Sequence, residues 1–216
     1  MAVKIPLTVK TTGHIYRWSQ SLAPILMPKP NVREKVVLAG LEQFHRLGFN
    51  GCSVEDITSF AGVPKGSFYN HFESKEDLAL EAIERYREAG LHKSLGEQNR
   101  SPVKRLKEYF AFLSKAFVDS DNRKGCLFGN LANEMADHSP VIRERLKSNF
   151  VGWTQVIASV IREGQESGEI ASSKKPQQLA GFLISAWEGT LVRARCTKDL
   201  SPLKDFNEIV FSTLLK

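Results

Sequence analysis

Apolar residues recur at helical spacing through almost the whole chain after residue 31. In the first such run Val37, Leu41 and Phe44 lie three or four positions apart, which places them on one face of an amphipathic helix. Similar runs follow to the C-terminus, and no segment alternates with the period of two that is typical of a strand. The sequence therefore predicts an all-α protein. Its apolar runs are far shorter than the ~20 residues that span a bilayer, so no membrane span is expected.

Two short helices joined by a tight turn are expected in the N-terminal part. Ser53, followed by two acids, is a helix start signal because its hydroxyl accepts a free N–H of the first turn. The Gly-Val-Pro sequence at 62–64 ends this helix and suits the first turn of another, over residues 65–71. Ser74 then starts a fourth helix. This spacing is typical of a helix-turn-helix, whose second helix enters the major groove of DNA, and also of a plain helical hairpin.

Three parts of the chain differ in composition. Residues 1–30 have no sustained period and contain no acid, which favours a flexible arm; a translation start at Met27 is the alternative. Residues 31–90 contain the expected helix-turn-helix and are interpreted as a DNA-binding domain of three helices with a fourth attached. Residues 91–216 consist of longer helices, and we expect them to form a second, C-terminal helical bundle.

Charge alone does not identify a nucleic-acid-binding protein here. The net charge is +6, yet residues 34–93 hold seven Lys or Arg against ten Asp or Glu. An argument for DNA binding therefore depends on local geometry. The three cysteines, Cys52, Cys126 and Cys196, stand far apart and form no metal-binding pair, so we expect no metal, no cofactor and a reducing, cytoplasmic setting.

The residues of the N-terminal domain resemble a known family. Residues 33–48, the start signal at 53–57, and above all the stretch VPKGSFYNHFESKEDL at 63–78 strongly resemble the TetR family of bacterial transcriptional regulators. The resemblance is close over residues 32–90. It implies a homodimeric repressor, with an N-terminal domain that binds a double-stranded DNA operator and a C-terminal domain that dimerises and binds an inducer.

The resemblance also implies which residues contact the DNA backbone. Ser53 matches a position that contacts phosphate, and Lys75 matches a lysine that binds phosphate. Tyr69 and His71 match the aromatic residue and the histidine that hold the backbone.

Other residues of the same short helix match positions that face the bases. Lys65, Gly66 and Ser67 occupy the positions that lie against base edges. Asn70 fits either a DNA contact or a place in the core. Phe68 is interpreted as a core residue that holds this helix in place.

The C-terminal half is rich in aromatic residues. In the family a pocket between these helices receives the effector, and apolar walls with a few polar groups suit a small, mostly hydrophobic ligand. The same residues fit an ordinary core equally well. The residues considered for the effector site are Tyr109, Phe110, Phe128, Trp153 and Trp187.

Cys126 follows Gly125 at an expected helix start. This arrangement resembles the branch of the family that contains the repressor of N-ethylmaleimide reductase genes, whose members sense electrophiles or oxidants through a cysteine. A helix N-terminus stabilises a thiolate, and Arg123 and Lys124 add positive charge. Arg195 stands about where that branch has a basic partner, although an arginine cannot replace a lysine amine in covalent chemistry. A small, buried, unreactive cysteine is the alternative.

Two further interpretations concern assembly and chemistry. We expect a homodimer through helices at 176–198 and 202–215, because one helix-turn-helix reads few base pairs. No sequence motif of a nucleotide-binding, metalloprotease or hydrolase site is present. Glu134, Asp137 and His138 are expected on a solvated helix end. An enzyme or a protein-binding adaptor of the same fold remains the alternative. The apolar surface for the dimer is expected from Trp187, Leu191, Phe206, Ile209 and Val210.

Overall fold

The computed structural model describes residues 31–90, 93–121 and 124–216. The predicted arm at 1–30 and the alternative start at Met27 lie outside these residues. Helices dominate, and the described residues contain no strand, so the all-α prediction is confirmed. The helices are α1 (Val32–Leu47), α2 (Val54–Ala61), α3 (Gly66–Tyr69), α4 (Lys75–Gly90), the 3₁₀ turn η1 (Lys93–Gly96), α5 (Pro102–Asp119), α6 (Leu127–Met135), α7 (Pro140–Glu166), α8 (Pro176–Thr197), α9 (Ser201–Ile209) and the π-helical turn η2 (Val210–Leu214).

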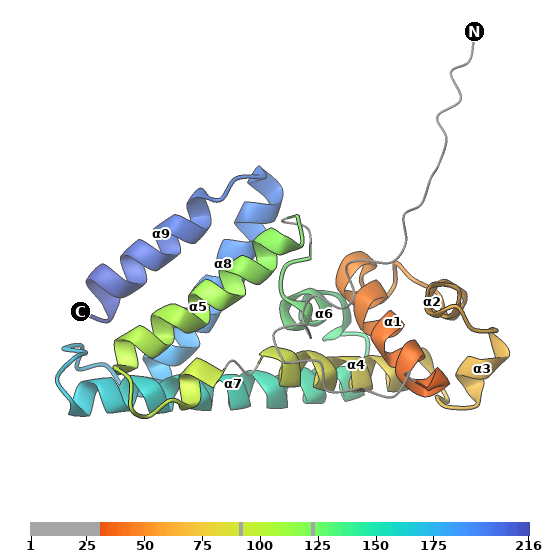
Figure 1. The fold of residues 1–216 in the computed structure, drawn as a ribbon, viewed down its shortest axis with the longest axis horizontal. Coiled ribbons are helices and arrows are strands. Elements are labelled where there is room, and N and C mark those ends of the chain that lie inside the picture. Colours follow the sequence, from red (N-terminus) through yellow and green to blue (C-terminus); the bar gives the residue numbers. More distant parts are fainter. Residues whose placement is uncertain (1–30, 91–92, 122–123) are drawn as a thin grey trace, which may run out of the picture.

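The helices form two groups along one long helix. Figure 1 shows α7 running along the base of the molecule, with α1 to α3 gathered at one end and α5, α8 and α9 stacked over the other. Helix α4 packs against both α1 and α7. Helix α6 contacts α1, α4 and α7, so it lies between the two groups. Helix α6 therefore connects the two groups of helices.

Local signals set most helix boundaries. Asn31, Ser101 and Ser139 each accept a backbone N–H of the first turn of α1, α5 and α7. Two predicted boundaries were wrong. Helix α3 covers only Gly66–Tyr69 rather than 65–71, and the final α-helix ends at Ile209, where the wider π-helical turn begins.

Aromatic side chains fill the space between α5, α8 and α9. The Phe110 ring lies 4.9 Å from that of Phe206 and 5.6 Å from that of Trp187, measured between centroids. The prediction that Trp187, Leu191, Phe206 and Val210 present apolar surface for a dimer was wrong, because each is buried within the subunit. Their face of the amphipathic helices points inward. Of the predicted set only Ile209 is exposed, and Phe182, which was not in that set, is exposed as well.

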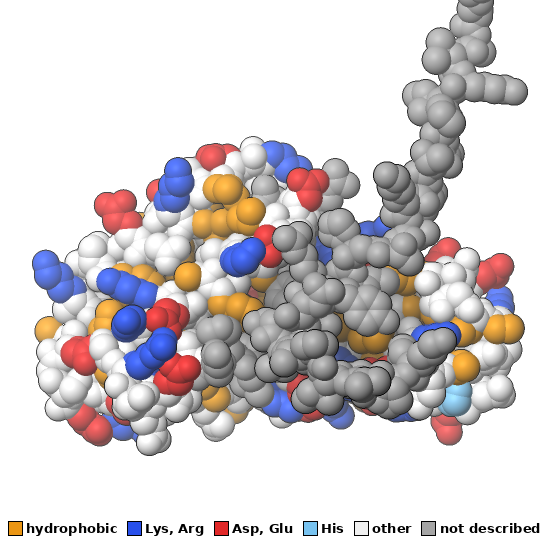
Figure 2. All heavy atoms as spheres, in the orientation of Figure 1, with side chains coloured by type: hydrophobic (Ala, Val, Ile, Leu, Met, Phe, Trp, Pro, Cys, Tyr) orange, Lys and Arg blue, Asp and Glu red, His pale blue; other side chains and the backbone are white. Residues whose placement is uncertain are grey.

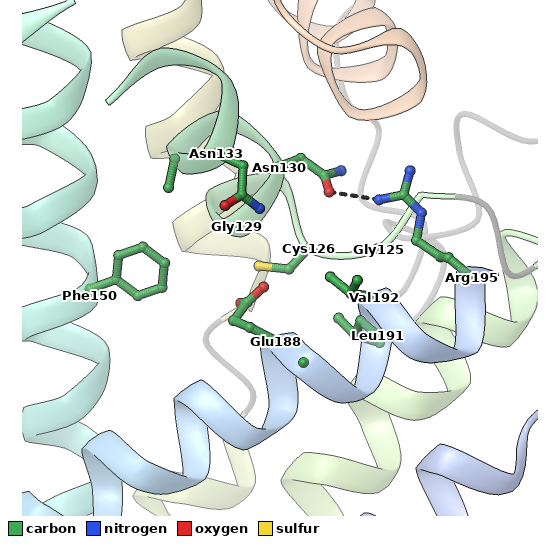
Figure 3. A pocket seen from close by; sticks show the side chains of 12 residues that line it. Gly125, Cys126, Gly129, Asn130, Asn133, Phe150, Glu188, Leu191, Val192 and Arg195 are labelled. Atoms are coloured by element: carbon green, nitrogen blue, oxygen red, sulfur yellow. Dashed lines mark hydrogen bonds between the residues drawn. The ribbon is translucent and has the colours of Figure 1, made fainter. Parts of the chain in front are cut away.

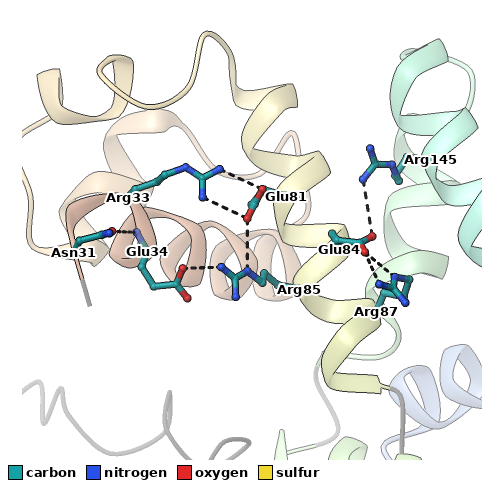
Figure 4. A network of polar contacts seen from close by, with 8 residues as sticks. All are labelled: Asn31, Arg33, Glu34, Glu81, Glu84, Arg85, Arg87 and Arg145. Carbon is teal, nitrogen blue, oxygen red and sulfur yellow. Dashed lines mark hydrogen bonds and ion pairs between the residues drawn. The ribbon is translucent and has the colours of Figure 1, made fainter. Parts of the chain in front are cut away.

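Ion pairs join the N-terminal group to the rest of the protein (Figure 4). Arg33 of α1 pairs with Glu81 of α4 at 3.2 Å, and Arg85 of α4 pairs with Glu34 of α1 at 2.8 Å. One turn further along α4, Glu84 binds Arg87 and lies 3.9 Å from Arg145 of α7. Each pair is partly exposed, so each contributes little to stability alone. Together they fix the orientation of α4 between α1 and α7.

The surface carries both signs of charge. Figure 2 shows positive and negative side chains intermingled over the C-terminal group, with apolar side chains between them. Among the described helices none is both long and apolar enough to span a membrane.

Candidate nucleic-acid interface and interior cavity

Paired hydrogen bonds fix the start of α2. The Ser53 hydroxyl accepts the N–H of Asp56 at 3.1 Å, and the Asp56 carboxylate accepts the N–H of Ser53 at 2.8 Å. The Ser53 hydroxyl also donates to this carboxylate at 2.7 Å, and this bond, together with the one from the Ser53 N–H, lowers the pKa of Asp56. Helix α2 ends at Gly62, whose φ of +66° is in the left-handed region that glycine adopts without strain. The start and the turn predicted from the sequence are therefore both present, and they set the direction in which α3 leaves.

Helix α3 is divided into a buried and an exposed side. Phe68 and Phe72 are buried with their rings 5.6 Å apart, which confirms the expected place of Phe68 in the core. Among residues 65–71, those expected to contact DNA are exposed, except that Ser67 is half-buried. Tyr69 is 59% exposed, an unusual position for a large aromatic side chain without a binding role. The exposed set is Lys65, Gly66, Tyr69, Asn70 and His71.

Lys65 has a weak partner in the free protein. Its ammonium group lies 3.2 Å from the Glu55 carboxylate, and both side chains are largely exposed. An exposed ion pair contributes about 0–1 kcal/mol to stability. Lys65 can therefore leave Glu55 for another acceptor at little cost in free energy.

Lys75 is held more firmly than the sequence indicated. Its ammonium group donates to the carbonyl oxygens of Phe49 and Cys52, each at 2.9 Å, and lies 4.3 Å from the centre of the Phe49 ring. It therefore fixes the loop between α1 and α2. Cys52 lies buried in that loop, where burial raises its thiol pKa to about 11.

A cavity of about 330 Å³ lies between α6, α7 and α8 (Figure 3). It opens beside Gly189 and Val192, which are exposed. Its walls combine apolar groups with a few polar ones, as ligand-binding cavities do. The lining residues are Gly125, Cys126, Gly129, Asn130, Ala132, Asn133, Phe150, Glu188, Gly189, Leu191, Val192 and Arg195.

Two of the residues considered for the effector site reach this cavity. Cys126 and Arg195 line it, and the Arg195 guanidinium donates to the side-chain oxygen of Asn130 at 2.8 Å. Tyr109, Phe110, Phe128, Trp153 and Trp187 do not line it.

Two of these aromatic residues, Phe128 and Trp153, pack around the cavity against Phe150. Phe128 lies edge-on to Tyr86 and to Phe150, and only Phe150 among these rings faces the cavity. Trp153 stacks behind Phe150, with its indole nitrogen buried and without a hydrogen-bond partner among the described residues. Phe110 and Trp187 belong to the core between α5, α8 and α9.

The environment of Cys126 differs from the one expected. Cys126 stands at the N-terminus of α6, as predicted, but it is 6% exposed, and burial, followed by the nearby Glu188 carboxylate, raises its thiol pKa well above the usual value. Lys124 points elsewhere, since its ammonium binds Glu42 of α1 at 2.7 Å. Arg123 lies outside the described residues. The prediction that surrounding positive charge stabilises the thiolate of Cys126 is therefore wrong for this conformation.

Glu188 is the acidic residue of the cavity, and sequence reasoning missed it. It interrupts an apolar stripe of α8 formed by Ile184, Trp187 and Leu191, all buried. An acid on such a stripe is the signal that could have identified it. Burial raises the pKa of its carboxyl group to about 7.

Helix α6 is hydrogen-bonded at both ends to α1 or to the loop that follows it. At its C-terminal end the Glu134 carboxylate accepts the N–H groups of Phe49 at 2.7 Å and Asn50 at 2.6 Å. At its N-terminal end His45 of α1 donates to the carbonyl oxygen of Gly125 at 2.9 Å, and burial lowers the pKa of this histidine to about 4. Glu134 thus does not lie on a solvated helix end, as had been expected. The cavity and the α1–α2 loop share one rigid element.

Comparison with known sequences agrees with this architecture. Residues 36–82 match the profile of bacterial regulatory proteins of the tetR family, and residues 102–210 match that of the tetracyclin repressor-like C-terminal domain. The chain is 37% identical over 192 residues to the HTH-type transcriptional repressor DhaR of Mycobacterium sp. (strain GP1), covering 88% of this chain and 95% of that protein. It is 27% identical to the repressor NemR of Escherichia coli K12, covering 81% and 89%.

Solved structures share the fold. A regulatory protein TetR from Rhodobacter sphaeroides is 31% identical with a TM-score of 0.77, covering 83% of this chain and 96% of that one. The reduced form of E. coli NemR has 26% identity and a TM-score of 0.76, covering 83% and 94%. Fold, turn geometry and sequence together define a helix-turn-helix DNA-binding transcriptional regulator. The chain belongs to the tetR family of bacterial regulatory proteins.

Proposed function

We propose that this regulator is a cytoplasmic, homodimeric repressor that holds a palindromic operator and leaves it when a small molecule occupies the cavity beside Cys126. The observation that supports DNA binding is the exposed side of α3. The turn at Gly62 and the buried Phe68 fix the position of this helix. Two similar proteins, DhaR and NemR, are named repressors, which supports repression rather than activation. The proposed DNA contacts are Ser53, Lys65, Gly66, Ser67, Tyr69, Asn70, His71 and Lys75.

The effector is proposed to act through α6. This helix lines the cavity with Cys126 and Asn130 and holds the α1–α2 loop with Glu134. A displacement of α6 is therefore transmitted to the start of α2. Half-sites one turn of DNA apart require a spacing of ~34–36 Å between the two recognition helices, so a shift of a few ångströms suffices for release. A reversibly bound ligand and a reagent that modifies Cys126 both fit this route.

Dimerisation is proposed through the outer faces of α8 and α9. Phe182 is 59% exposed and Ile209 is 60% exposed, and Ser185 and Gly189 continue the same face of α8. Apolar side chains of this size on neighbouring helices favour burial against a second copy. Sedimentation at micromolar concentration is expected to give twice the 24.2 kDa mass of one chain, and Phe182→Glu together with Ile209→Glu is expected to give the single chain. A monomer from the unmodified protein would contradict this interface.

Lys65 and Lys75 are expected to affect DNA binding in different ways. Lys65→Ala is expected to lower discrimination between operator and scrambled duplex about tenfold, because a base contact carries sequence information. Lys75→Ala is expected to weaken both duplexes alike, because its ammonium fixes the loop before α2 through Phe49 and Cys52. It is also expected to reduce the salt slope by about 1, because the third N–H of this ammonium is proposed to contact a phosphate, which carries no sequence information. Titrations of labelled duplexes at several salt concentrations measure both. The control is Lys174→Ala, an exposed lysine between α7 and α8. Equal loss on both duplexes for both variants would refute these roles.

A further inference from the structure

Glu188 places a carboxylate in the wall of the cavity. Figure 3 shows its side chain rising from α8 toward α6, with the sulfur of Cys126 beside it and the Phe150 ring of α7 to one side. A Cβ atom at Gly129 of α6 would lie 2.1 Å from Oε2 of Glu188, so a larger residue at this position would displace the carboxylate. The fold therefore keeps a space for this acid.

This carboxylate lacks a partner of opposite charge. Its Oε1 atom is buried and has no hydrogen-bond partner among the described residues. A buried acceptor without a donor is costly and rare in folded proteins. The titratable groups that face Glu188 from other helices are Cys126 from α6, Tyr86 from α4 and Tyr109 from α5, and raised pKa values keep all three uncharged at neutral pH. None of them supplies the positive charge that a carboxylate attracts.

Arg195 is the basic residue of the cavity lining, and it is held away from Glu188. It follows Glu188 by seven residues, which is about 10 Å along the axis of α8. Its guanidinium donates to the side-chain oxygen of Asn130 at 2.8 Å. The same side chain lies against Gly125, where an added Cβ atom would be 3.2 Å from Nη1. Arg195 therefore does not neutralise the carboxylate.

The rest of the wall suits an organic cation. The Phe150 ring lines the cavity, and an aromatic ring attracts a cation to its face. The side-chain amide of Asn133 lines the same space, and its oxygen is a second acceptor for N–H groups. Leu191 and Val192 provide apolar contacts for a short hydrocarbon chain. A volume of about 330 Å³ limits the occupant to a small molecule.

We propose that the cavity binds a small alkylammonium ion without a covalent bond and that Glu188 is the acceptor for its N–H groups. The proposal rests on the proposed function only in taking this cavity as the effector site. The ammonium group of the ligand supplies both the hydrogen-bond donor and the positive charge that the buried carboxylate lacks. An alcohol of the same size supplies a donor without the charge. A carboxylic acid places a second negative charge beside Glu188.

The pH dependence of binding follows from Glu188. Burial raises the pKa of its carboxyl group to about 7, so the charged form is populated above that pH and lost below it. Of the described residues α7 contributes only Phe150 to the lining, so that helix adds no titratable group. A primary amine, like the lysine side chain, stays protonated up to about pH 10. The affinity for the cation is therefore expected to be highest at pH 8–9 and to fall as the pH drops through 7.

The test compares three ligands with the same six-carbon chain, hexylamine, hexan-1-ol and hexanoate, by calorimetric titration of the full chain. At pH 8 the unmodified protein is expected to bind hexylamine at least about tenfold more tightly than the other two. Glu188→Gln is expected to weaken hexylamine binding roughly 10- to 100-fold, the usual contribution of a hydrogen bond to a charged group, and to abolish its pH dependence. Hexan-1-ol binding is expected to change less than about threefold. Glu166→Gln, which removes an exposed acid of α7, is the control.

A hexylamine affinity in Glu188→Gln within threefold of the unmodified protein would overturn the proposal. So would no measurable binding of hexylamine, equal binding of hexan-1-ol, or tighter binding of hexanoate, which would assign recognition to Arg195. If Glu188→Gln does not fold, the ligand comparison and the pH profile of the unmodified protein decide. Operator binding is measured separately, with and without hexylamine. A protein that binds hexylamine but binds no operator, or keeps its operator when the amine is bound, would refute the proposed function and leave the cation site in place.

Discussion

Phe110→Ala is expected to lower the free energy of unfolding by about 3–5 kcal/mol, the usual cost of removing a fully buried phenylalanine. Phe110 is 0% exposed, and its ring contacts those of Trp187, Phe206 and Phe211. The loss of all three contacts leaves a space that rigid helices cannot fill. Urea unfolding followed by circular dichroism, at one fixed protein concentration, measures the change.

The matched control lies on the same helix. Val118 is 43% exposed near the end of α5, and Val118→Ala is expected to change stability by less than about 0.5 kcal/mol. A Phe110→Ala protein with unchanged stability and an altered effector response would place Phe110 in a ligand site instead of the core.

Glu134→Ala is expected to weaken operator binding at least tenfold. Its carboxylate is the acceptor for the N–H groups of Phe49 and Asn50, and a hydrogen bond to a charged group contributes ~1.5–3 kcal/mol. Without it the loop that precedes α2 loses its attachment to α6, so the position of α3 is less well defined. Hydrogen exchange of the Phe49 and Asn50 amides and operator titration measure the two parts of this effect.

Asp137→Ala is the control for this substitution. Asp137 is an exposed acid just beyond the same end of α6, so its removal changes the net charge equally. Wild-type protection of both amides in Glu134→Ala would contradict the role of this carboxylate, and so would equal loss of operator affinity in both variants.

Features set by neighbouring residues were predicted correctly from the sequence. The cap at Ser53, the left-handed turn at Gly62 and the inward-facing Phe68 each depend on residues within a few positions of one another. The start of α6 at Cys126 was found in the same way. The sides of α8 and α9 were confused because apolar residues lie on both faces: Trp187 turned out to be core, whereas Phe182 is exposed.

Features that depend on distant residues were not predictable. Lys75 holds carbonyl groups more than twenty positions away, and Glu134 holds amides more than eighty positions away. No local pattern distinguishes such side chains from solvated ones. The electrostatic setting of Cys126 was misjudged for the same reason. Its neighbours in sequence suggested positive charge, whereas the fold places Glu188 against the thiol.

Selection of bound fragments from a pool of random duplexes by the purified chain tests the central claim most directly. The claim is that the chain recognises a two-fold symmetric operator through the paired α3 helices. Enrichment of one inverted repeat, with half-sites about one helical turn apart, is the predicted result. That enrichment should disappear with Lys65→Ala combined with Tyr69→Ala. An unchanged pool, or equal retention of the enriched duplex and its scrambled version, would contradict the account.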